Sequence, residues 1–497
     1  MPSSNTSRVS DTLHRLNEGA AERAYQRGDS YAHHRPLSVY LQVASGCNIE
    51  CYMCIEQLRP VGTRRGRDLK SLSREVFDKL CAQVFPYSSR LHIGFGGEPS
   101  LAPDFQYFIE RGYECGQRVD LTTNGTRLGQ PGLAAALARC VTYLQVSMDG
   151  ATRETYERIR IGSSWQRLRA NLDLLNEHRL ADEPDRRTRL ALCFVLMKSN
   201  LHELPAFVEL AAALHAEEVR AQHVIPTTDA GKPETLFDDQ QRYNEVLEVA
   251  RQRAVALGVY LDAPRPYPSP PTAAPAVTAP QPTSPSPEAE DRTTPRTKRL
   301  ECRLPTQQLF INYEGRVMPC CHPHANVKMK AGDLRIEDFD TIWNNAMYRA
   351  LRGSLRDGDL HPICRTCSIA QDPPPAPEDP ELLRSAPTLE EWAADRPASD
   401  DSKQERPLID LLQRAGVLDY LQSVESERDG LTRHTANLET ERPHLLKHIS
   451  NLEAERAALR EHVTNLESLR SQQAAARLTP PPRAHWLASL RRGRGPA

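Results

Sequence analysis

The segment Leu37–Cys54, LSVYLQVASGCNIECYMC, joins an expected β-strand to three closely spaced cysteines. Apolar residues occupy every second position of its first half, which is typical of a strand with one buried face. The second half carries Cys47, Cys51 and Cys54 in the pattern C-x3-C-x2-C. A strand followed directly by a cysteine-rich loop predicts a site at the carboxyl end of a sheet.

Further strand-like runs follow along the chain, separated by amphipathic stretches that are typical of helices. These runs are LHIGFGG (91–97), RVDLTTNG (118–125), TYLQVSMDG (142–150), LALCFVLMKSN (190–200) and VRAQHVIP (219–226). Strands that alternate with helices predict an α/β fold with a parallel sheet. We therefore expect a partial (β/α)6, TIM-like barrel with a small C-terminal auxiliary domain and a helical, coiled-coil extension.

Length and composition restrict the possible functions. A chain of 497 residues is too long for one ordinary core, and its net charge of −2 gives no electrostatic reason for a nucleic-acid partner. No apolar run is long enough to cross a membrane, and the N-terminus lacks an apolar signal core. These features predict a cytoplasmic protein with neither a nucleic-acid nor a membrane partner. Thiols stay reduced in that compartment, so clustered cysteines indicate metal binding.

Composition also suggests where the domains begin and end. Pro, Ala, Ser and Thr dominate one long segment, and that composition predicts a disordered linker because it cannot form a packed core. The expected parts are an N-terminal extension (1–36), a core domain (37–262), the Pro-rich linker (263–298), a cysteine-bearing auxiliary domain (299–371), a Pro-rich break with a short helix (372–419), a heptad-repeat coiled coil (420–472) and a basic flexible tail (473–497).

The heptad region allows two interpretations. Val or Leu recurs every seventh residue from Val424 to Leu466, which is one seam of a coiled coil. The second seam position is an arginine in every other repeat, and Pro443 interrupts the helix pattern. A coiled-coil homodimer and a single solvated helix both remain open.

Two metal sites would suit the first cysteine cluster. A structural zinc ion needs four ligands in a closed tetrahedron, and only His33 and His34, placed before the strand, are near in sequence. An iron–sulfur cubane held by three thiolates instead leaves one iron open for a substrate or cofactor. The lack of a well-spaced fourth ligand favours the iron–sulfur cluster.

The triad after a first strand, with Met53 before the last cysteine, resembles the radical S-adenosylmethionine (SAM) superfamily. The resemblance implies that Cys47, Cys51 and Cys54 bind a [4Fe–4S] cluster whose open iron is chelated by SAM. One electron from the cluster cleaves SAM, and the resulting 5′-deoxyadenosyl radical takes a hydrogen atom from the substrate. This chemistry implies a reducing partner such as flavodoxin or ferredoxin.

The segment GFGGEP (94–99) resembles the GGEP motif of the same superfamily. By this resemblance, Gly96 and Gly97 allow close approach of the backbone, and Glu98 accepts hydrogen bonds from the amine of SAM. Without its context the segment would be an ordinary strand-to-helix turn, with Pro99 at the first helical position.

Two later motifs, LTTNGT (121–126) and VSMDGATRETYERIR (146–160), also fit the resemblance. It implies that Ser147 and Arg158 face the carboxylate and ribose of SAM, and that Asn124 belongs to the cofactor site at the end of the third strand. Because Asn-Gly is also a strong turn former, a purely structural role for Asn124 remains open.

Beyond the linker, Cys302, Cys320, Cys321, Cys364 and Cys367 form the second cluster. Taken alone, four of these thiols could bind zinc. Next to a radical SAM core, the segment resembles the SPASM/twitch-type auxiliary iron–sulfur domain. Since no cysteine follows Cys367, the resemblance implies the shortened form with one auxiliary [4Fe–4S] cluster. The implied ligands are Cys302, Cys320, Cys364 and Cys367, and Cys321 is the alternative to its neighbour.

The resemblance implies a radical SAM oxidoreductase or epimerase, and we expect a small polyol or sugar-type substrate. One alternative is an enzyme that modifies a peptide or protein, which the short N-terminal extension disfavours. Another is a non-catalytic iron–sulfur or zinc scaffold. Cys193 lies inside an expected strand and is a candidate hydrogen-atom donor, although an inert buried cysteine is more common.

Overall fold

The computed structural model describes residues 4–54, 69–184, 186–226, 228–268, 302–322, 328–365, 367 and 385–396, with isolated positions between 447 and 460. The chain divides into two compact units, Met1–Glu405 and Arg406–Ala497. The predicted coiled coil and basic tail belong to the second unit and lie outside the described residues, apart from those isolated positions. The features below all belong to the first unit.

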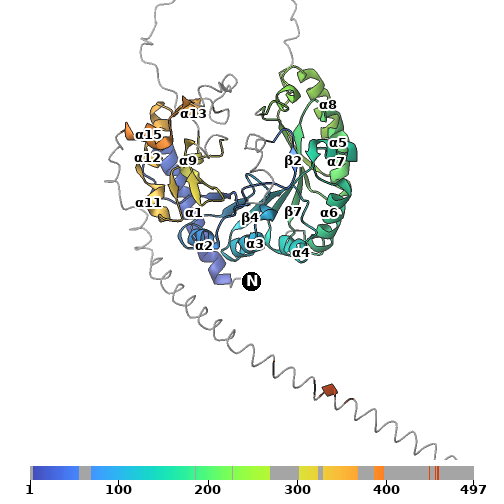
Figure 1. Ribbon diagram of the computed structural model, residues 1–497, viewed down its shortest axis with the longest axis horizontal. Helices are drawn as coiled ribbons and strands as arrows, with labels where there is room; N and C mark the ends of the chain where they lie inside the picture. The colour runs from blue at the N-terminus through green and yellow to red at the C-terminus, as the bar shows by residue number, and fades with distance from the viewer. Residues whose placement is uncertain are drawn as a thin grey trace, which may run out of the picture. The chain divides into compact units, whose positions relative to one another are not determined.

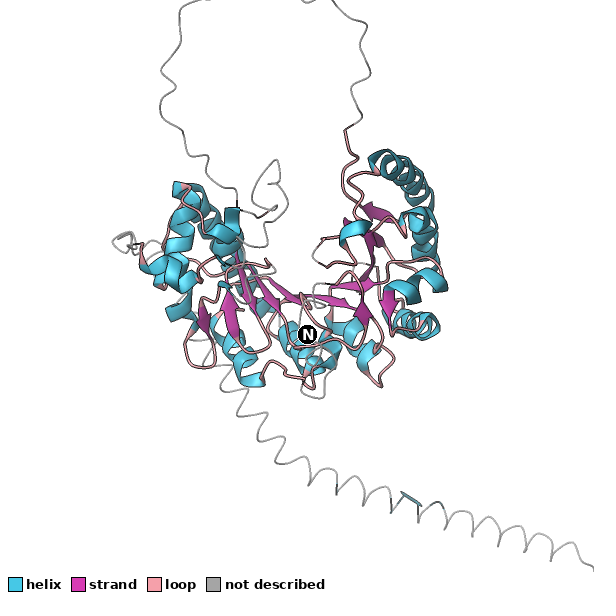
Figure 2. Cartoon of the chain, turned by 45° about the horizontal axis from the view of Figure 1, so that its top comes forward, coloured by secondary structure: helices cyan, strands magenta, loops and turns pink. Residues whose placement is uncertain are grey.

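A ten-stranded sheet forms the centre of this unit (Figures 1 and 2). All the strands expected in the core domain are present and run parallel to their neighbours. They are β1 (Ser38–Leu41), β3 (Arg90–Ile93), β4 (Arg118–Thr123), β5 (Tyr143–Ser147), β7 (Arg189–Leu196) and β8 (Glu218–His223). The predicted α/β fold is confirmed. The sheet is longer than expected, because the strand order is β12-β11-β10-β1-β3-β4-β5-β7-β8-β9.

The sheet is curved, and the helices pack against its outer face, so that the strands form the inner face (Figure 2). The helices of the core domain are α2 (Arg74–Gln83), η3 (Pro99–Leu101), α3 (Phe105–Glu114), α4 (Leu133–Cys140), α5 (Arg153–Ile159), α6 (Trp165–Arg179), η4 (Leu201–Glu203), α7 (Leu204–Ala213), η5 (Lys232–Glu234) and α8 (Gln240–Leu257). Alternate strand residues such as Leu91, Leu121 and Leu192 are fully buried in one continuous apolar core. The residues between them therefore face the inner side, where the polar groups collect.

Local capping explains where several helices begin and end. Ser73, Thr152 and Ser164 precede α2, α5 and α6, and each hydroxyl accepts a hydrogen bond from a backbone N–H in the first turn. At its other end, α8 stops at Gly258, whose φ of +68° favours glycine. These sequence-local signals fix the helices that hold the strand ends in place.

The auxiliary segment continues the same sheet. Strand β10 (Gln308–Ile311) pairs in parallel with β1, which places Leu309 opposite Val39. Beyond β10, strands β11 (Arg316–Met318) and β12 (Gly332–Asp333) pair antiparallel and form one edge of the sheet. Strand β9 (Tyr260–Asp262) pairs in parallel with β8 and forms the opposite edge. The core and auxiliary domains predicted as separate parts thus share one sheet. Pairing between strands so distant in sequence leaves no local pattern to detect.

The N-terminal extension belongs to the folded unit as well. Helix α1 (Ser4–Arg27) carries Asn17, whose side-chain amide donates to the backbone carbonyls of Arg35 and Tyr87 at 3.0 Å. Glu22 on the same helix forms an ion pair with Arg303 of the auxiliary segment. The extension is thereby anchored on both the core and the auxiliary segments. The auxiliary helices are α9 (Leu304–Gln307), α11 (Phe339–Trp343), α12 (Ala346–Asp357), α13 (Pro362–Arg365) and α15 (Leu389–Ala394).

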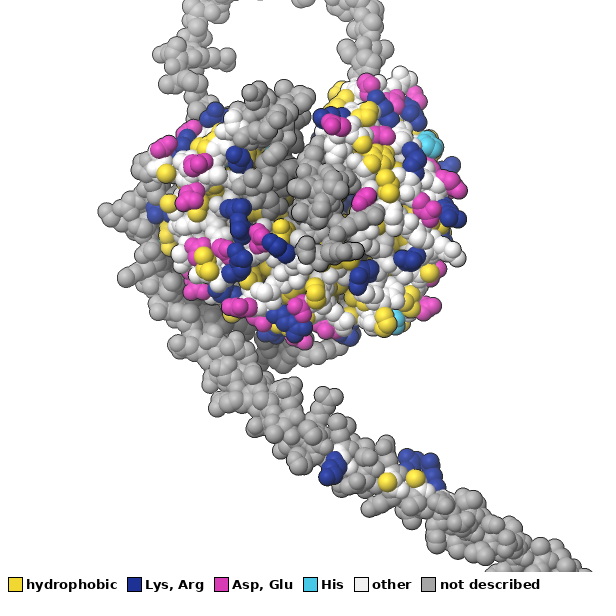
Figure 3. Space-filling model, in the orientation of Figure 1, with side chains coloured by type: hydrophobic (Ala, Val, Ile, Leu, Met, Phe, Trp, Pro, Cys, Tyr) yellow, Lys and Arg dark blue, Asp and Glu magenta, His cyan; other side chains and the backbone are white. Residues whose placement is uncertain are grey.

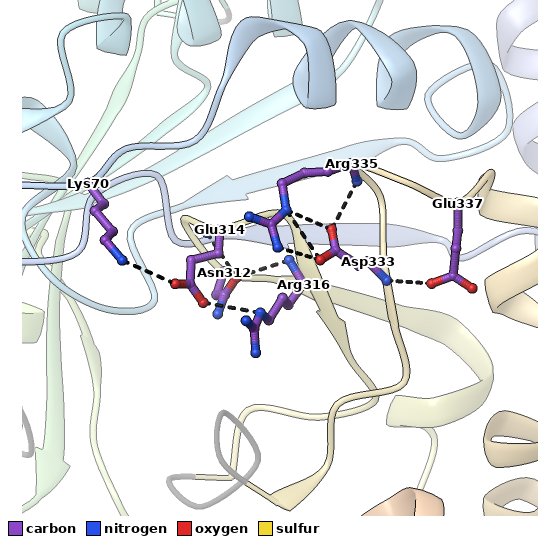
Figure 4. A network of polar contacts seen from close by, with 7 residues as sticks. All are labelled: Lys70, Asn312, Glu314, Arg316, Asp333, Arg335 and Glu337. Atoms are coloured by element: carbon purple, nitrogen blue, oxygen red, sulfur yellow. Dashed lines mark hydrogen bonds and ion pairs between the residues drawn. The ribbon is translucent and has the colours of Figure 1, made fainter.

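A polar network surrounds the hairpin between β10 and β11 (Figure 4). The carboxylate of Glu314 lies 3.6 Å from Lys70 Nζ of the core domain and 3.2 Å from Arg316 Nε. Asp333 and Arg335 form a second ion pair at 2.5 Å. Because these groups are partly exposed, each pair contributes only about 0–1 kcal/mol, and their main effect is to fix the orientation of the hairpin.

Acidic and basic side chains are mixed over the described surface in Figure 3. Within the part of the chain that the structure describes, no helix is both long enough and apolar enough to cross a membrane.

Candidate functional site

The loop after β1 places the first three cysteines beside an apolar cluster. Within this loop, β2 (Glu50–Cys51) pairs antiparallel with β6 (Arg160–Ile161), so that Cys51 lies opposite Arg160. Cys51 is 8% exposed, and Cys47 and Cys54 are partly buried. The surrounding apolar side chains are those of Ile49, Met53, Ile159, Met197 and Val224. The thiols are therefore largely shielded from water at the carboxyl end of the sheet.

A buried ion pair lies directly against Cys51. Arg160 Nη1 is 3.7 Å from Cys51 Sγ and acts as a donor to it, while Nη2 lies 2.7 Å from Asp149 Oδ2. The side chains of Arg160 and Asp149 are 8% and 0% exposed. Asp149 also accepts from the backbone N–H of Val195 at 2.8 Å. The arginine thus brings an N–H donor to the sulfur, and its charge is balanced by the aspartate.

Asn124 connects the cysteine loop to the GGEP loop. Its backbone N–H donates to Glu98 Oε2 at 2.7 Å, and its side-chain amide lies 3.6 Å from Cys47 Sγ. The same amide donates to Asn48 Oδ1 at 2.8 Å. The structure therefore brings together three residues that the resemblance assigned to one cofactor site: Cys47, Glu98 and Asn124.

Glu98 is 1% exposed, and neighbouring donors hold its carboxylate. Oε1 accepts from the backbone N–H and the hydroxyl of Ser100 and from the hydroxyl of Thr123, at 3.1, 2.6 and 2.7 Å. Oε2 accepts from Asn124. Oε1 is thus occupied by three donors and Oε2 by one. This arrangement fixes the GGEP loop to the end of β4 and leaves Oε2 with the greater remaining capacity to accept.

Gly97 in this loop leaves no room for a side chain. Its φ is +65°, and a Cβ would lie 2.7 Å from the carbonyl oxygen of Ala44 and 2.8 Å from that of Gly46. The backbone of the next residue, Glu98, donates to that same Gly46 carbonyl at 2.8 Å. The two loops therefore pack backbone against backbone, as the predicted role of Gly97 requires. Gly96, which precedes it, is partly buried.

Residues from the ends of β7 and β8 support the cysteine loop from another side. The hydroxyl of Tyr52 donates to Glu234 Oε1 at 3.2 Å and lies 3.2 Å from the hydroxyl of Ser199. The Thr228 hydroxyl donates to the backbone carbonyl of Tyr52 at 3.1 Å. Arg158 donates to the Ser199 carbonyl at 3.4 Å, so it is held by this loop rather than by the Glu98 network.

The inner side of the sheet carries a row of polar residues that includes Cys193. The strand register aligns Ser147 of β5, Cys193 of β7 and Arg220 of β8. Gln145 Oε1 accepts from Arg220 Nη1 at 3.3 Å and from Cys193 Sγ at 3.9 Å. Burial raises the pKa of Cys193 to about 12, so its thiol remains protonated at neutral pH. This row forms a polar wall next to the cysteine loop.

The thiols of the first cluster are suited to binding a metal-based cofactor. Burial raises the pKa values of both Cys47 and Cys51 to about 11, so the metal-free thiols are protonated at neutral pH. Binding must replace those protons with iron, and the N–H donors of Asn124 and Arg160 then face sulfur atoms that carry negative charge. Within the described residues, no three His, Cys, Asp or Glu side chains are grouped to hold a single metal ion. A cubane has a different requirement, since each thiolate binds a separate iron.

The second cluster assembles thiols from three separate segments. Burial raises the pKa of Cys302 to about 11 and that of Cys364 to about 12, and it raises the pKa of Cys320 strongly. The pKa values of Cys302 and Cys364 are raised further by the proximity of Cys367. Cys321 is exposed, whereas Cys320 is partly buried among the other thiols. This difference favours Cys320 as the ligand of the adjacent pair.

Sequence reasoning missed two kinds of residue. One is Arg160, which donates to Cys51 and pairs with Asp149, and the other comprises Thr123 and Ser100, which hold Glu98. The signal for Arg160 was its position in the same motif as Arg158, two residues earlier, but only strand pairing shows which arginine reaches the thiol. For Ser100, its closeness to Glu98 in sequence was a usable signal, because serine commonly donates to a nearby carboxylate.

Two family models match separate parts of the folded unit. Residues 41–211 match the model of the radical SAM superfamily, and residues 302–368 match that of the iron–sulfur cluster-binding SPASM domain. The chain is a member of the radical SAM superfamily with a C-terminal SPASM domain, and it is an enzyme of that class. Such a core binds a [4Fe–4S] cluster together with SAM, and a SPASM domain implies auxiliary iron–sulfur binding.

The individual relatives share low sequence identity with this chain. The AdoMet-dependent heme synthase of Methanosarcina barkeri is 26% identical over 329 residues, which cover 64% of this chain and 85% of that protein. The PqqA peptide cyclase of Rhodopseudomonas palustris is 27% identical over 190 residues, covering 38% of this chain and 47% of that protein. Among solved structures, Streptococcus suis SuiB bound to S-adenosylmethionine matches with a TM-score of 0.47 and 14% identity, over 67% of this chain and 71% of that chain.

Proposed function

We propose that this radical SAM enzyme modifies a peptide by abstracting a hydrogen atom from an unactivated carbon. The observation that carries the chemistry is the contact network that joins Cys47 to Glu98 through Asn124. A thiol-bearing loop and a carboxylate-bearing loop become one unit, which suits a cofactor that touches both. The bound [4Fe–4S] cluster would supply the electron that cleaves SAM, and a flavodoxin or ferredoxin would replace that electron.

The chain's own residues have distinct roles in this proposal. Cys47, Cys51 and Cys54 hold the cluster, and the apolar cluster around them excludes water. Glu98 Oε2, with one internal donor, accepts from the SAM amine. Arg160 donates to Cys51 Sγ, and Asp149 keeps it oriented and charge-balanced. Ser147 and Arg158 keep their predicted roles toward the SAM carboxylate and ribose.

Two lines of support favour a peptide over the polyol or sugar that we expected from the sequence. One sequence relative of the core domain is named for a peptide substrate, whereas the relatives given above include none named for a sugar or polyol. The inner wall offers both donors and acceptors: Arg220 lies opposite Asp262 in the strand register and donates to Gln145 Oε1. Alternating donors and acceptors suit a peptide backbone, which presents one N–H and one C=O per residue.

Cys193 is proposed as a hydrogen-atom donor at the same wall. A donor must keep its hydrogen at working pH, and the raised pKa of this thiol satisfies that requirement. In D2O, the wild-type enzyme should place one deuterium on the product from the exchanged thiol, and the thiyl radical left behind would be reduced by one electron from the flavodoxin or ferredoxin and reprotonated by solvent. Cys193→Ser should still cleave SAM but should form no deuterated product. Deuterated product from Cys193→Ser would remove Cys193 from this role.

The substrate class can be tested by following the hydrogen atom. The anaerobically reconstituted enzyme, with dithionite and SAM, would be given an extract of its own organism grown in deuterated medium. Deuterium should appear in 5′-deoxyadenosine, as measured by mass spectrometry, and should disappear when the extract is first digested with a broad-specificity protease. Deuterium transfer that survives digestion would contradict a peptide substrate, and a tetrapyrrole-depleted extract would then test a heme-type substrate.

A further inference from the structure

Arg352 is a buried cation within the SPASM domain. It lies on α12 and is 2% exposed. Its partners in the described part of the chain are neutral oxygens. Nε donates to the carbonyl of Pro305 at 2.9 Å, and Nη1 donates to the carbonyl of Trp343 at 2.9 Å and to Asn344 Oδ1 at 3.2 Å. Nη2 has no hydrogen-bond partner among the described residues.

Aromatic rings hold the guanidinium in this position. Its central carbon lies 4.3 Å from the ring centre of Trp343 and 4.9 Å from that of Tyr348. Burial lowers the pKa of Arg352 to about 9, so the side chain is still charged at neutral pH. Ring faces attract a cation, but they do not neutralise it. An unpaired buried charge is costly, so its retention calls for an anionic neighbour.

The position of Arg352 points to the auxiliary thiols as that neighbour. Pro305, which accepts from Nε, is three residues after Cys302, and both Cys302 and Arg352 line one small cavity beneath α1. The hydroxyl of Tyr348, under the guanidinium, donates to the carbonyl of Met318, two residues before Cys320. Arg352 thus contacts the segment that follows Cys302 directly, and it reaches the segment that carries Cys320 through Tyr348.

Arg160 at the SAM-binding site provides the contrast. It is also buried, but Asp149 lies 2.7 Å away, so the pair adds no net charge. Asp29 lines the same cavity as Cys302 and Arg352, but it forms its ion pair with Arg27. In the described part of the chain, Arg352 therefore has no acid paired with it as Asp149 is paired with Arg160. An iron–sulfur cluster held by four thiolates is anionic and becomes more negative by one charge on reduction. A fixed positive charge beside it would therefore favour the reduced form.

We infer that Arg352 is the counter-charge of the auxiliary cluster and raises its reduction potential relative to a cluster without that charge. The inference rests on the assignment of Cys302, Cys320, Cys364 and Cys367 as ligands, and it does not depend on the substrate. A higher potential would suit an acceptor of one electron, the use that an oxidation would make of this cluster.

The test measures the potential of the auxiliary cluster by itself. In a Cys51→Ala parent, the SAM-binding cluster is lost, so the remaining EPR signal comes from the auxiliary domain. Arg352→Gln removes the charge and keeps a donor for the carbonyl oxygens, and Arg352→Lys keeps the charge. Arg356→Gln is the matched control, because Arg356 lies on the same helix and lines the same cavity but pairs with Asp357.

In an EPR-monitored redox titration, Arg352→Gln should shift the reduction equilibrium at least tenfold toward the oxidised form, which is 59 mV for a one-electron couple. Arg352→Lys and Arg356→Gln should each stay within threefold of the parent. An iron-loaded Arg352→Gln protein with the parent's potential would overturn the inference. If that variant does not fold, Arg352→Lys decides: a folded, iron-loaded Lys variant shifted tenfold would show that charge is not what matters. A Cys51→Ala parent that retains no iron would remove the auxiliary cluster itself, whatever the substrate tests give.

Discussion

The two cysteine clusters differ in how they are assembled and in how their buried arginines are balanced. Cys47, Cys51 and Cys54 come from one loop, and Arg160 behind them is paired with Asp149. The auxiliary thiols come from three segments, and Arg352 near them has only neutral partners in the described part of the chain. The buried arginine at the first site is thus neutralised by an acid of the protein. The buried arginine near the auxiliary thiols has no such acid among the described residues and could balance a bound anion.

The difference also shows which site depends more on the remainder of the fold. The first loop is held by residues at the ends of several core strands, including Glu98, Asn124 and Glu234. The auxiliary segments join the core through the pairing of β10 with β1 and through α1. Substitution of a cysteine in one cluster should therefore leave the other cluster bound, and the predictions below test this independence.

The largest effect is expected for Cys51→Ala. Loss of one of three thiolates should remove the SAM-binding cluster and abolish formation of 5′-deoxyadenosine, measured by chromatography after dithionite and SAM are added. Cys115→Ala is the control, since Cys115 ends α3 in the outer layer and should leave the activity intact. SAM cleavage at the wild-type rate by Cys51→Ala would contradict the assignment of the first cluster.

Next in size is Cys364→Ala, which should abolish product formation but leave part of the SAM cleavage. Iron analysis should fall from about eight to about four atoms per chain, because one cubane of two is lost. The exposed neighbour of a proposed ligand supplies the control: Cys321→Ala should keep both clusters. If Cys321→Ala loses the iron and Cys320→Ala keeps it, the two adjacent cysteines exchange roles.

A smaller effect, on stability, is expected for Asp149→Asn. The substitution leaves Arg160 charged and unpaired in a buried site, which costs about 3–5 kcal/mol of unfolding free energy. Urea denaturation of the metal-free protein would measure it. Glu209→Gln breaks the exposed ion pair with Arg253 and should cost at most about 1 kcal/mol. Equal costs for the two variants would show that the Asp149–Arg160 pair is not desolvated as described.

The smallest expected effect is the difference in stability between two Gly→Ala variants at positions with similar φ angles. Gly97→Ala and Gly132→Ala both place a side chain at positive φ, +65° and +77°, which costs roughly 1–2 kcal/mol. Only Gly97 adds a clash with the carbonyls of Ala44 and Gly46, for roughly 1–3 kcal/mol more. Gly97→Ala should also weaken SAM binding, measured by calorimetry on the reconstituted enzyme. If both variants lose the same stability, the close approach of the two loops is wrong.

Much of the first site could be predicted because its motifs are short and contiguous in the sequence. The spacing of Cys47, Cys51 and Cys54 and the GGEP loop ending at Pro99 each occupy a short stretch, and the strands before them alternate with period two. Asn124 was left between a turn role and a cofactor role. In the structure its side chain accepts within its own turn, from Thr126, and also donates toward Cys47, and its role at the cofactor stays a prediction. Local patterns did not show that second contact, because it joins the ends of different strands.

The sequence alone determined the α/β class, the order of the core strands and the loop with three cysteines, because each is recognised from short stretches of the chain. The resemblance of its motifs to the radical SAM superfamily indicated the chemistry, and the auxiliary ligands stay a prediction from that resemblance. Only the tertiary structure decided that β10 continues the core sheet, that α1 anchors the auxiliary segment, and that Arg160 is paired while Arg352 is not. Those features depend on strand pairing and on burial, which set the cost of a charge by what surrounds it in space.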